Sequence, residues 1–347
     1  MTAPSIDFEL PPALEAHEPP EARGLTRDGV RLLVGRRDEA DPAPGFLVEH
    51  RRFTDLPNLL DPGDVLVVNR SGTLPAAIDL PDGTRAVHFS TRTPDGDWLV
   101  ELRRGTDPDP GGEPGTRIAL PGGAAIVLLR RHVSGRLWHA TPVLPGVVPD
   151  VPSYLSRYGR PIRYGYIAEQ WPLSAYQTPF AAIPGSAEMP SAGRPFSPEV
   201  VTRLVARGIV VAPITLHCGV ASPEFHEPPY AEWFDVPEAT AAVVNDALQR
   251  SARVVAVGST VVRALESTAG PGPRVRPGSG WTDLVVTPDA GVRVVSGLLT
   301  GLHEPRASHL LMLEAIAGTA LVRACYDAAL AENYLWHEFG DVNLLLP

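Results

Sequence analysis

The hydrophobic positions between residues 209 and 267 form two short runs, each followed by glycine and small polar residues. The first run, 209–216, leads to His217, and the second, 253–257, leads to Gly258. Short β-branched runs that end in glycine or hydroxyl residues are typical of buried strands in a mostly parallel sheet. Because the carboxyl ends of such strands face the crevice where α/β proteins bind ligands, the pattern predicts a small-molecule site here. It requires His217 and Ser259 to share one cleft.

Helical patterns occur between the strand-like runs. Ser197 is a good N-cap residue and Pro198 suits the first helical position, so a helix is predicted over 199–207, ending at Gly208. Gly258-Ser259-Thr260 predicts a tight turn and a helix N-terminus, whose free N–H groups suit an anion or a carboxylate. Further helices are expected at 53–60, 151–158, 238–251 and, as one or two buried helices, 308–330, and further strands at 31–34, 45–50, 65–69, 282–286 and 292–295.

Between Gly72 and Pro145 the pattern changes to short alternating segments separated by turns rich in glycine, aspartate and proline. That spacing is typical of a small β-barrel or sandwich. A chain of 347 residues also exceeds the usual size of a single core. We therefore expect an α/β (α+β) main domain built from 1–71 and 146–347, interrupted by an all-β, barrel-like domain over 72–145.

Composition narrows the class of protein. The net charge is −10, and all 30 lysine or arginine positions are arginine. We attribute this bias to the base composition of the genome rather than to function. An acidic chain binds nucleic acid poorly without specificity, although paired arginines such as Arg51-Arg52 and Arg103-Arg104 allow one basic face. The apolar runs are too short to span a membrane, and no secretory signal is recognisable. Two cysteines form no disulfide framework and no metal cluster, so we expect a cytoplasmic protein. We also expect a monomer.

Motif-like segments follow one another along nearly the whole chain. They are Phe8-Glu9-Leu10-Pro11-Pro12, His50-Arg51-Arg52-Phe53-Thr54-Asp55-Leu56, Gly63-Asp64-Val65-Leu66-Val67-Val68-Asn69, Tyr176-Gln177-Thr178, Pro190-Ser191-Ala192-Gly193, Thr215-Leu216-His217-Cys218-Gly219, Val257-Gly258-Ser259-Thr260-Val261-Val262-Arg263-Ala264-Leu265-Glu266-Ser267, Gly280-Trp281-Thr282-Asp283, Gly297-Leu298-Leu299-Thr300 and Phe339-Gly340-Asp341. Taken together in this order, they resemble the S-adenosylmethionine:tRNA ribosyltransferase-isomerase family of the queuosine pathway.

The resemblance implies an α/β domain with a β-barrel insertion, in agreement with the pattern above. It implies an enzyme that transfers the ribosyl part of S-adenosylmethionine to the aminomethyl group of a deazaguanine base in tRNA. The transferred unit is then rearranged to an epoxycyclopentanediol, and adenine and methionine are released. S-adenosylmethionine is thus the expected substrate and tRNA the expected partner, and no metal is expected, since no ligand cluster argues for one.

The chain departs from the family pattern in several loops. The family's Pro-Thr-Ala-Gly-Leu-His-Phe is here Pro190 to Phe196 with Arg194-Pro195 in place of Leu-His, so a histidine is missing. A His-x-Met-His-x-Glu loop is shortened around Pro228-Pro229. The family's Asn-Asp-Thr-Arg is here Asn69-Arg70-Ser71-Gly72. Two alternatives therefore stay open. One is a paralogue that uses S-adenosylmethionine on a small-molecule acceptor without tRNA, and the other is a non-catalytic nucleotide- or RNA-binding module.

The implied reaction needs a base, an acid for departing adenine and a clamp for the methionine carboxylate. His217 is the leading base, because imidazole titrates at about pH 6.5, and His303 is the second; a purely structural histidine is the alternative for each. Glu232 and Asp283 are further catalytic candidates, which could bind the ribose hydroxyls or the amino group of the substrate. The alternative for both is a solvent-exposed surface carboxylate. Arg263 could clamp the carboxylate or pair with Glu266.

The remaining candidates concern binding. Ser259 and Thr260 would bind the ligand or cap a helix. Tyr176 and Gln177 would stack on and hydrogen-bond a base, with a buried tyrosine as the alternative. Cys218 is interpreted as a small buried residue rather than a nucleophile. The expected cofactor-binding set is Gly219, Gly258, Ser259, Thr260, Arg263, Thr300, Tyr176 and Gln177.

Overall fold

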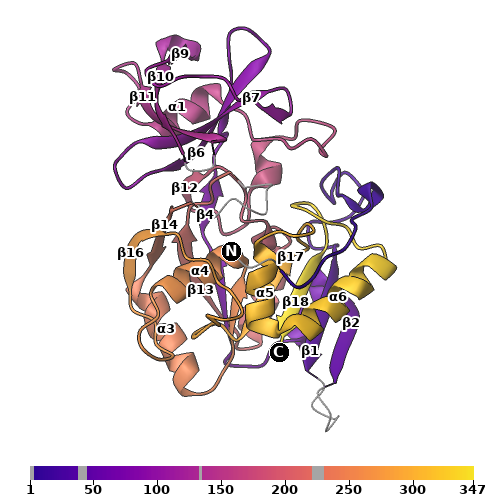
Figure 1. Cartoon of the computed structure of the whole chain (residues 1–347). Coiled ribbons are helices and arrows are strands. Elements are labelled where there is room, and N and C mark those ends of the chain that lie inside the picture. Colours follow the sequence, from indigo (N-terminus) through magenta and orange to yellow (C-terminus); the bar gives the residue numbers. More distant parts are fainter. Residues whose placement is uncertain (1–3, 38–44, 133–134, 221–229) are drawn as a thin grey trace.

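The computed structural model describes residues 4–37, 45–132, 135–220 and 230–347. A nine-stranded sheet forms the centre of the larger, lower part of the molecule in Figure 1. In order across the sheet its strands are β16 (Gly278–Thr282), β14 (Glu232–Val236), β13 (Val210–Leu216), β3 (Val65–Asn69), β15 (Val254–Val257), β17 (Gly297–Gly301), β18 (Val342–Leu346), β1 (Arg31–Arg37) and β2 (Phe46–Arg52).

The four central strands β13, β3, β15 and β17 are parallel to one another. On one side β14 and β16 are antiparallel additions, and on the other β17 meets β18 antiparallel. The prediction of a mostly parallel sheet is therefore wrong for the flanks, where antiparallel pairs join the sheet, and confirmed for the centre. The consequence for function is that four carboxyl ends reach the same edge, called here the carboxyl edge.

The central strands of the nine-stranded sheet are buried on both faces. Successive side chains of a strand point to opposite faces, and accordingly Val65 and Val67 enter one core while Leu66 and Val68 enter another. The first core lies under α3 (Glu238–Gln249), α4 (Ser259–Ser267), α5 (His309–Ala317) and α6 (Thr319–Ala331), and the second under α2 (Pro198–Ala206) and the 3-10 helix η2 (Phe53–Asn58).

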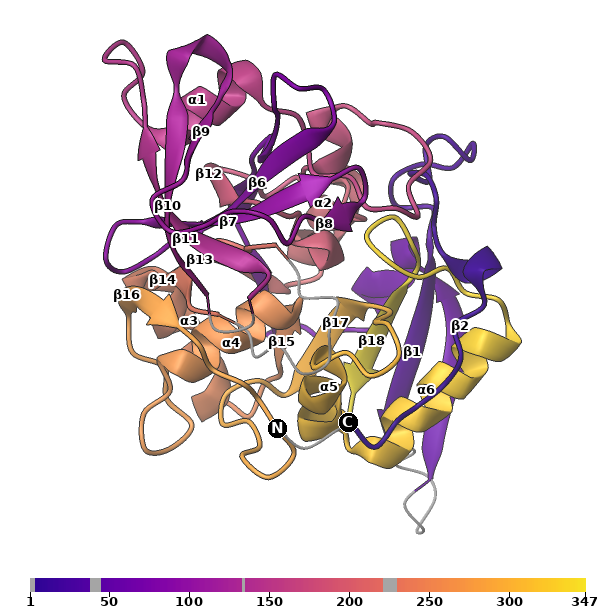
Figure 2. The same ribbon diagram turned by 45° about the horizontal axis from the view of Figure 1, so that its top comes forward.

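A curled, seven-stranded antiparallel sheet forms the upper part of the molecule (Figure 2). Its strands are β5 (Ala77–Asp79), β6 (Arg85–Arg92), β7 (Trp98–Arg104), β8 (Asp107–Pro108), β9 (Arg117–Ala119), β10 (Ala125–Arg131) and β11 (Leu137–Val143). Within the described pairings the path ends at β5 and β9, so the predicted all-β segment forms a curled, half-barrel sheet, and a complete barrel is not confirmed. The helix α1 (Val151–Tyr158) packs into the same core, beyond the predicted boundary at residue 145.

Two short parallel strands, β4 (Ser71–Thr73) and β12 (Ile183–Ser186), lie between the two parts (Figure 1). The chain enters the insertion through β4, directly after the carboxyl end of β3, and β12 follows the insertion. This connection places the insertion above the carboxyl edge.

Most predicted helices are confirmed to within two residues, and the segment 308–330 forms two helices separated at Gly318, whose φ of 76° suits glycine. The predicted strands at 282–286 and 292–295 are wrong, since β16 ends at Thr282 and β17 begins at Gly297. The Glu266 carboxylate accepts the N–H groups of residues 293, 294 and 295, so these donors are satisfied without a strand partner.

No single helix in the described part of the chain is long and apolar enough to cross a membrane; α5 and α6 meet that composition only as a pair bent by 119°.

Candidate functional site

Asn69 ties together the ends of the central strands. Its side-chain amide donates to the Leu216 carbonyl at 2.8 Å and to the Thr260 hydroxyl at 3.2 Å. Its side-chain oxygen accepts the N–H groups of Leu216 at 3.1 Å and Ser71 at 3.0 Å. The strand that delivers His217 and the helix that begins at Ser259 are thereby held side by side at the carboxyl edge. Sequence reasoning did not include Asn69 in the site, although its place at the end of an apolar strand was the available signal.

His217 follows β13 and is fixed by short contacts. Its Nδ1 lies 2.8 Å from the Ser71 hydroxyl, and its ring stacks on Trp233 with centroids 5.2 Å apart. The ring also lies against Gly185, where a Cβ would come within 2.5 Å of three ring atoms. Burial lowers the pKa of His217 to about 4, so the imidazole is neutral at pH 7.

Two further hydroxyl contacts extend from His217 into the protein. The Ser71 hydroxyl lies 2.6 Å from the Ser186 hydroxyl, which accepts the N–H of Cys218 at 2.9 Å. Cys218 is buried and its burial raises the pKa of the thiol, as expected for a small buried residue rather than a nucleophile. The turn after β13 is thus fixed by hydrogen bonds to residues of β4 and β12.

Glu232 and Arg263 form an ion pair beside this turn. Glu232 accepts the N–H of Gly219 at 2.6 Å and pairs with the guanidinium of Arg263. Arg263 also donates to the carbonyls of Thr282 at 2.8 Å and Leu284 at 3.1 Å, and the two side chains are only 10 % and 12 % exposed. Every nitrogen of the guanidinium therefore has a protein partner. The carboxylate that pairs with Arg263 is Glu232, whereas the sequence had suggested Glu266 as the alternative to a ligand.

His303 lies at the far end of the carboxyl edge. Its Nε2 lies 2.9 Å from the Thr300 hydroxyl, and its ring stacks on His309 with centroids 4.6 Å apart. Burial lowers the pKa of His303 well below its usual value. Because β13 and β17 are three strand spacings apart, about 14 Å, the structure does not bring His303 next to His217.

The other predicted residues have different surroundings. The Gln177 amide accepts the N–H of Thr73 at 3.0 Å and donates to its carbonyl at 2.8 Å, so it braces β4. Tyr176 packs on Phe339 with centroids 5.2 Å apart, and burial raises its pKa to about 12. Asp283 is exposed. None of these three lies among the hydrogen-bonded neighbours of His217 within the described ranges.

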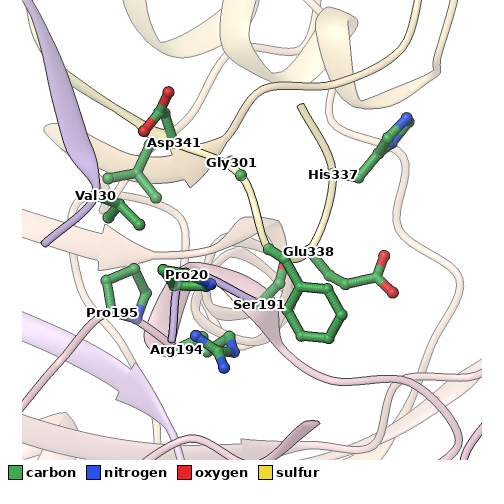
Figure 3. Close-up of a pocket in the computed structure, with 12 residues that line it drawn as sticks. Pro20, Val30, Ser191, Arg194, Pro195, Gly301, His337, Glu338 and Asp341 are labelled. Atoms are coloured by element: carbon green, nitrogen blue, oxygen red, sulfur yellow. The ribbon is translucent and has the colours of Figure 1, made fainter. Parts of the chain in front are cut away.

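A small cavity opens where β17 ends and β18 begins (Figure 3). Gly301, Val30 and Asp341 line it, together with Arg194. Arg194 stands in the segment that departs from the family pattern; it is buried, donates to the Ala175 carbonyl at 2.9 Å and pairs with Glu21. The departure therefore places a hydrogen-bonded, ion-paired arginine beside Gly301 at the carboxyl edge. The departure at Pro228-Pro229 lies outside the described residues.

Among residues 4–37, 45–132, 135–220 and 230–347, no group of three or more His, Cys, Asp or Glu side chains is placed to hold a metal ion.

Comparison with known proteins matches residues 4–345 to the family described as queuosine biosynthesis protein. The S-adenosylmethionine:tRNA ribosyltransferase-isomerase of Moorella thermoacetica is 36% identical over 366 residues, covering 100% of both chains. The protein of that name from Thermus thermophilus is 36% identical and covers 99% of each chain. A crystal structure of S-adenosylmethionine tRNA ribosyltransferase from Thermotoga maritima has a TM-score of 0.54 at 29% identity, covering 98% of this chain and 99% of that one.

Proposed function

This chain belongs to the queuosine biosynthesis protein family, and from that premise we propose that it catalyses the reaction for which its full-length relatives are named. It is an S-adenosylmethionine-dependent ribosyltransferase-isomerase of tRNA modification. It transfers the ribosyl part of S-adenosylmethionine to the aminomethyl-deazaguanine of tRNA, rearranges it, and releases adenine and methionine.

The observation that carries this proposal is the row of polar groups that Asn69 holds together at the carboxyl edge. The end of β13, with His217, and the N-terminus of α4, with Ser259 and Thr260, meet there within one hydrogen-bonded network. Ligands of open α/β sheets bind outside the carboxyl ends of the parallel strands. We place the sulfonium nucleoside over this network.

The methionine carboxylate would bind at the N-terminus of α4. Gly258 precedes the helix with a φ of 91°, and no side chain caps the helix. The first N–H groups of a helix have no intrahelical acceptor and favour an anion. Arg263 is already paired with Glu232, so the backbone of Ser259 and Thr260 supplies the carboxylate site in place of the arginine clamp.

The acceptor base would enter between the carboxyl edge and the insertion. The insertion reaches the turn after His217, because Ser90 of β6 accepts the N–H of Val220 at 2.9 Å and lies 2.8 Å from the Tyr230 hydroxyl. We also propose the domain division given above, with 1–71 and 146–347 as the main domain and a barrel-like 72–145 as the insertion. The helix α1 is added to the insertion, because it packs into the core of that part. A tRNA acceptor implies a cytoplasmic enzyme, and we propose that it acts as a monomer.

The test is to incubate the protein with S-adenosylmethionine, with and without tRNA that carries the aminomethyl-deazaguanine, and to follow adenine and methionine by chromatography. The proposal expects both products only with the modified tRNA. Equal turnover without RNA would identify a small-molecule paralogue instead. Binding of S-adenosylmethionine with no product under any condition would identify a binding module.

A further inference from the structure

Two serine hydroxyls connect the backbone N–H of Cys218 to the ring of His217. The chain of contacts runs from the Cys218 N–H to the Ser186 hydroxyl, then to the Ser71 hydroxyl, then to His217 Nδ1, with separations of 2.9, 2.6 and 2.8 Å. Ser71 and Ser186 are 1% and 0% exposed, so water does not compete for these hydroxyls. The direction of each hydrogen bond can therefore be worked out from donors and acceptors.

Each serine hydroxyl has one hydrogen to donate. The Cys218 amide can only donate, so Ser186 accepts from it and keeps its own hydrogen for another acceptor. The Ser186 hydroxyl has two other neighbours that could accept its hydrogen, the Ser71 hydroxyl at 2.6 Å and the Cys218 thiol, and sulfur is the weaker acceptor. If Ser186 donates to Ser71, then Ser71 donates to Nδ1 of His217, and every donor is used. The opposite direction would leave the buried hydrogen of Ser186 with only the weakly accepting Cys218 thiol, so the direction toward Ser71 is favoured.

We propose that Ser71 and Ser186 hold His217 in the tautomer that carries its proton on Nε2, so that His217 donates a hydrogen bond to the bound nucleoside and does not act as a base through Nε2. This inference rests on the proposed function for the identity of the ligand. Ser71 and Ser186 are positioning residues, and His217 is the residue that contacts substrate.

The surroundings of the ring support this role. Stacking on Trp233 and the close approach of Gly185 fix the orientation of the imidazole. Within the described chain, Nε2 of His217 has no hydrogen-bond partner, which leaves it for a ligand. The low pKa that burial gives His217 keeps the ring neutral at pH 7, so one of its two nitrogens is unprotonated and the hydroxyl contacts select which one. A neutral N–H donor suits a lone pair on the nucleoside, either a purine ring nitrogen, where charge develops as adenine leaves, or a ribose oxygen.

Nitrogen-15 NMR of the full-length protein, labelled in its histidine rings and without substrate, tests the tautomer at pH 7. His217→Gln identifies the signals by their loss. The expected spectrum has a protonated Nε2 and an unprotonated Nδ1 for His217. Ser71→Ala should introduce the Nδ1-protonated form, whereas Ser71→Thr, which keeps the hydroxyl, should preserve the wild-type pattern. Ser267→Ala, which removes a hydroxyl bonded to Thr282 instead, is the matched control and should change nothing. A wild-type spectrum with Nδ1 protonated overturns the proposal.

Two further readouts connect the tautomer to the ligand. S-adenosylhomocysteine, which lacks the reactive sulfonium, should shift the Nε2 signal on binding; binding without such a shift would overturn the contact with the nucleoside. Ser71→Ala should lower kcat for adenine release about 10–100-fold, the size of effect seen when a metal-binding histidine loses its orienting partner, with little change in KM. If wild type shows the expected tautomer but no turnover with modified tRNA, the proposed function fails and the tautomer stands. Full turnover with the opposite tautomer separates the two in the other direction.

Discussion

Replacing Glu232 by glutamine removes the negative charge from an ion pair that is almost entirely buried. Glutamine keeps the length of the side chain and an oxygen that can accept the Gly219 N–H. Arg263 then carries an uncompensated charge with only 10 % of its side chain exposed. Breaking a buried pair from one side costs about 3–5 kcal/mol. Since the carbonyls of Thr282 and Leu284 still accept from Arg263, we expect the lower end, about 3 kcal/mol.

The assay is urea denaturation of wild type, Glu232→Gln, Arg263→Gln and the double variant. Because the two side chains contact each other, the double variant should lose less stability than the sum, with a coupling of about 1–3 kcal/mol. The control is Asp246→Asn, which removes the carboxylate of an exposed pair with Arg250 and should cost about 0–1 kcal/mol. If Glu232→Gln costs no more than Asp246→Asn, the buried pair does not brace the turn.

Three further predictions concern Gly185, Glu266 and the pH dependence of stability. Gly185→Ala places a Cβ within 2.5 Å of the His217 ring, so it should cost about 1–3 kcal/mol and slow adenine release, whereas Gly278→Ala, with open space around it, should leave release unchanged. Glu266→Ala should cost about 2 kcal/mol and accelerate hydrogen exchange at residues 293–295, whose N–H groups it leaves without acceptors; unchanged exchange would contradict this. Burial lowers the pKa of His217 and His309 to about 4, so below about pH 6.5 the unfolded chain binds protons that the folded chain does not. The free energy of unfolding should therefore fall from pH 6.5 toward pH 4, by about 2 kcal/mol per histidine at pH 5, and a flat profile in urea titrations would refute it.

Local signals in the sequence predicted the helices well. Ser197 caps α2 by accepting the N–H of Val200 at 3.2 Å, as its position before Pro198 indicated. The same local reasoning failed between β16 and β17, where apolar residues suggested strands. There the backbone donors bond to Glu266, which lies 27 to 29 residues away, and no pattern within the segment itself reveals that partner.

The site was predicted in part for a similar reason. The ends of two apolar runs located His217 and Gly258, because a buried strand followed by glycine or hydroxyl residues is a local pattern. The ion pair of Arg263 could not be found this way: Glu266 was nearby on the same helix, but the pairing crosses 31 residues to Glu232 on a neighbouring strand. Asn69 connects the neighbouring elements because β3 lies between β13 and β15. That strand order is set by the fold and is not visible in any local sequence pattern.

The segment that follows Asn69 connects the family departures to the inference about His217. Where the family pattern reads Asn-Asp-Thr-Arg, this chain has Asn69-Arg70-Ser71-Gly72, so both charged positions change while the third position keeps a hydroxyl. The new Arg70 is accommodated at the side of the sheet, where it pairs with Asp235 at 3.1 Å and donates to the Thr215 hydroxyl. Ser71 keeps the one chemical group that the proposed His217 tautomer needs, a hydroxyl that lies 2.6 Å from the Ser186 hydroxyl and 2.8 Å from Nδ1. The proposal therefore expects the His217 tautomer to survive a change of charge at residue 70 but not the loss of the hydroxyl at residue 71.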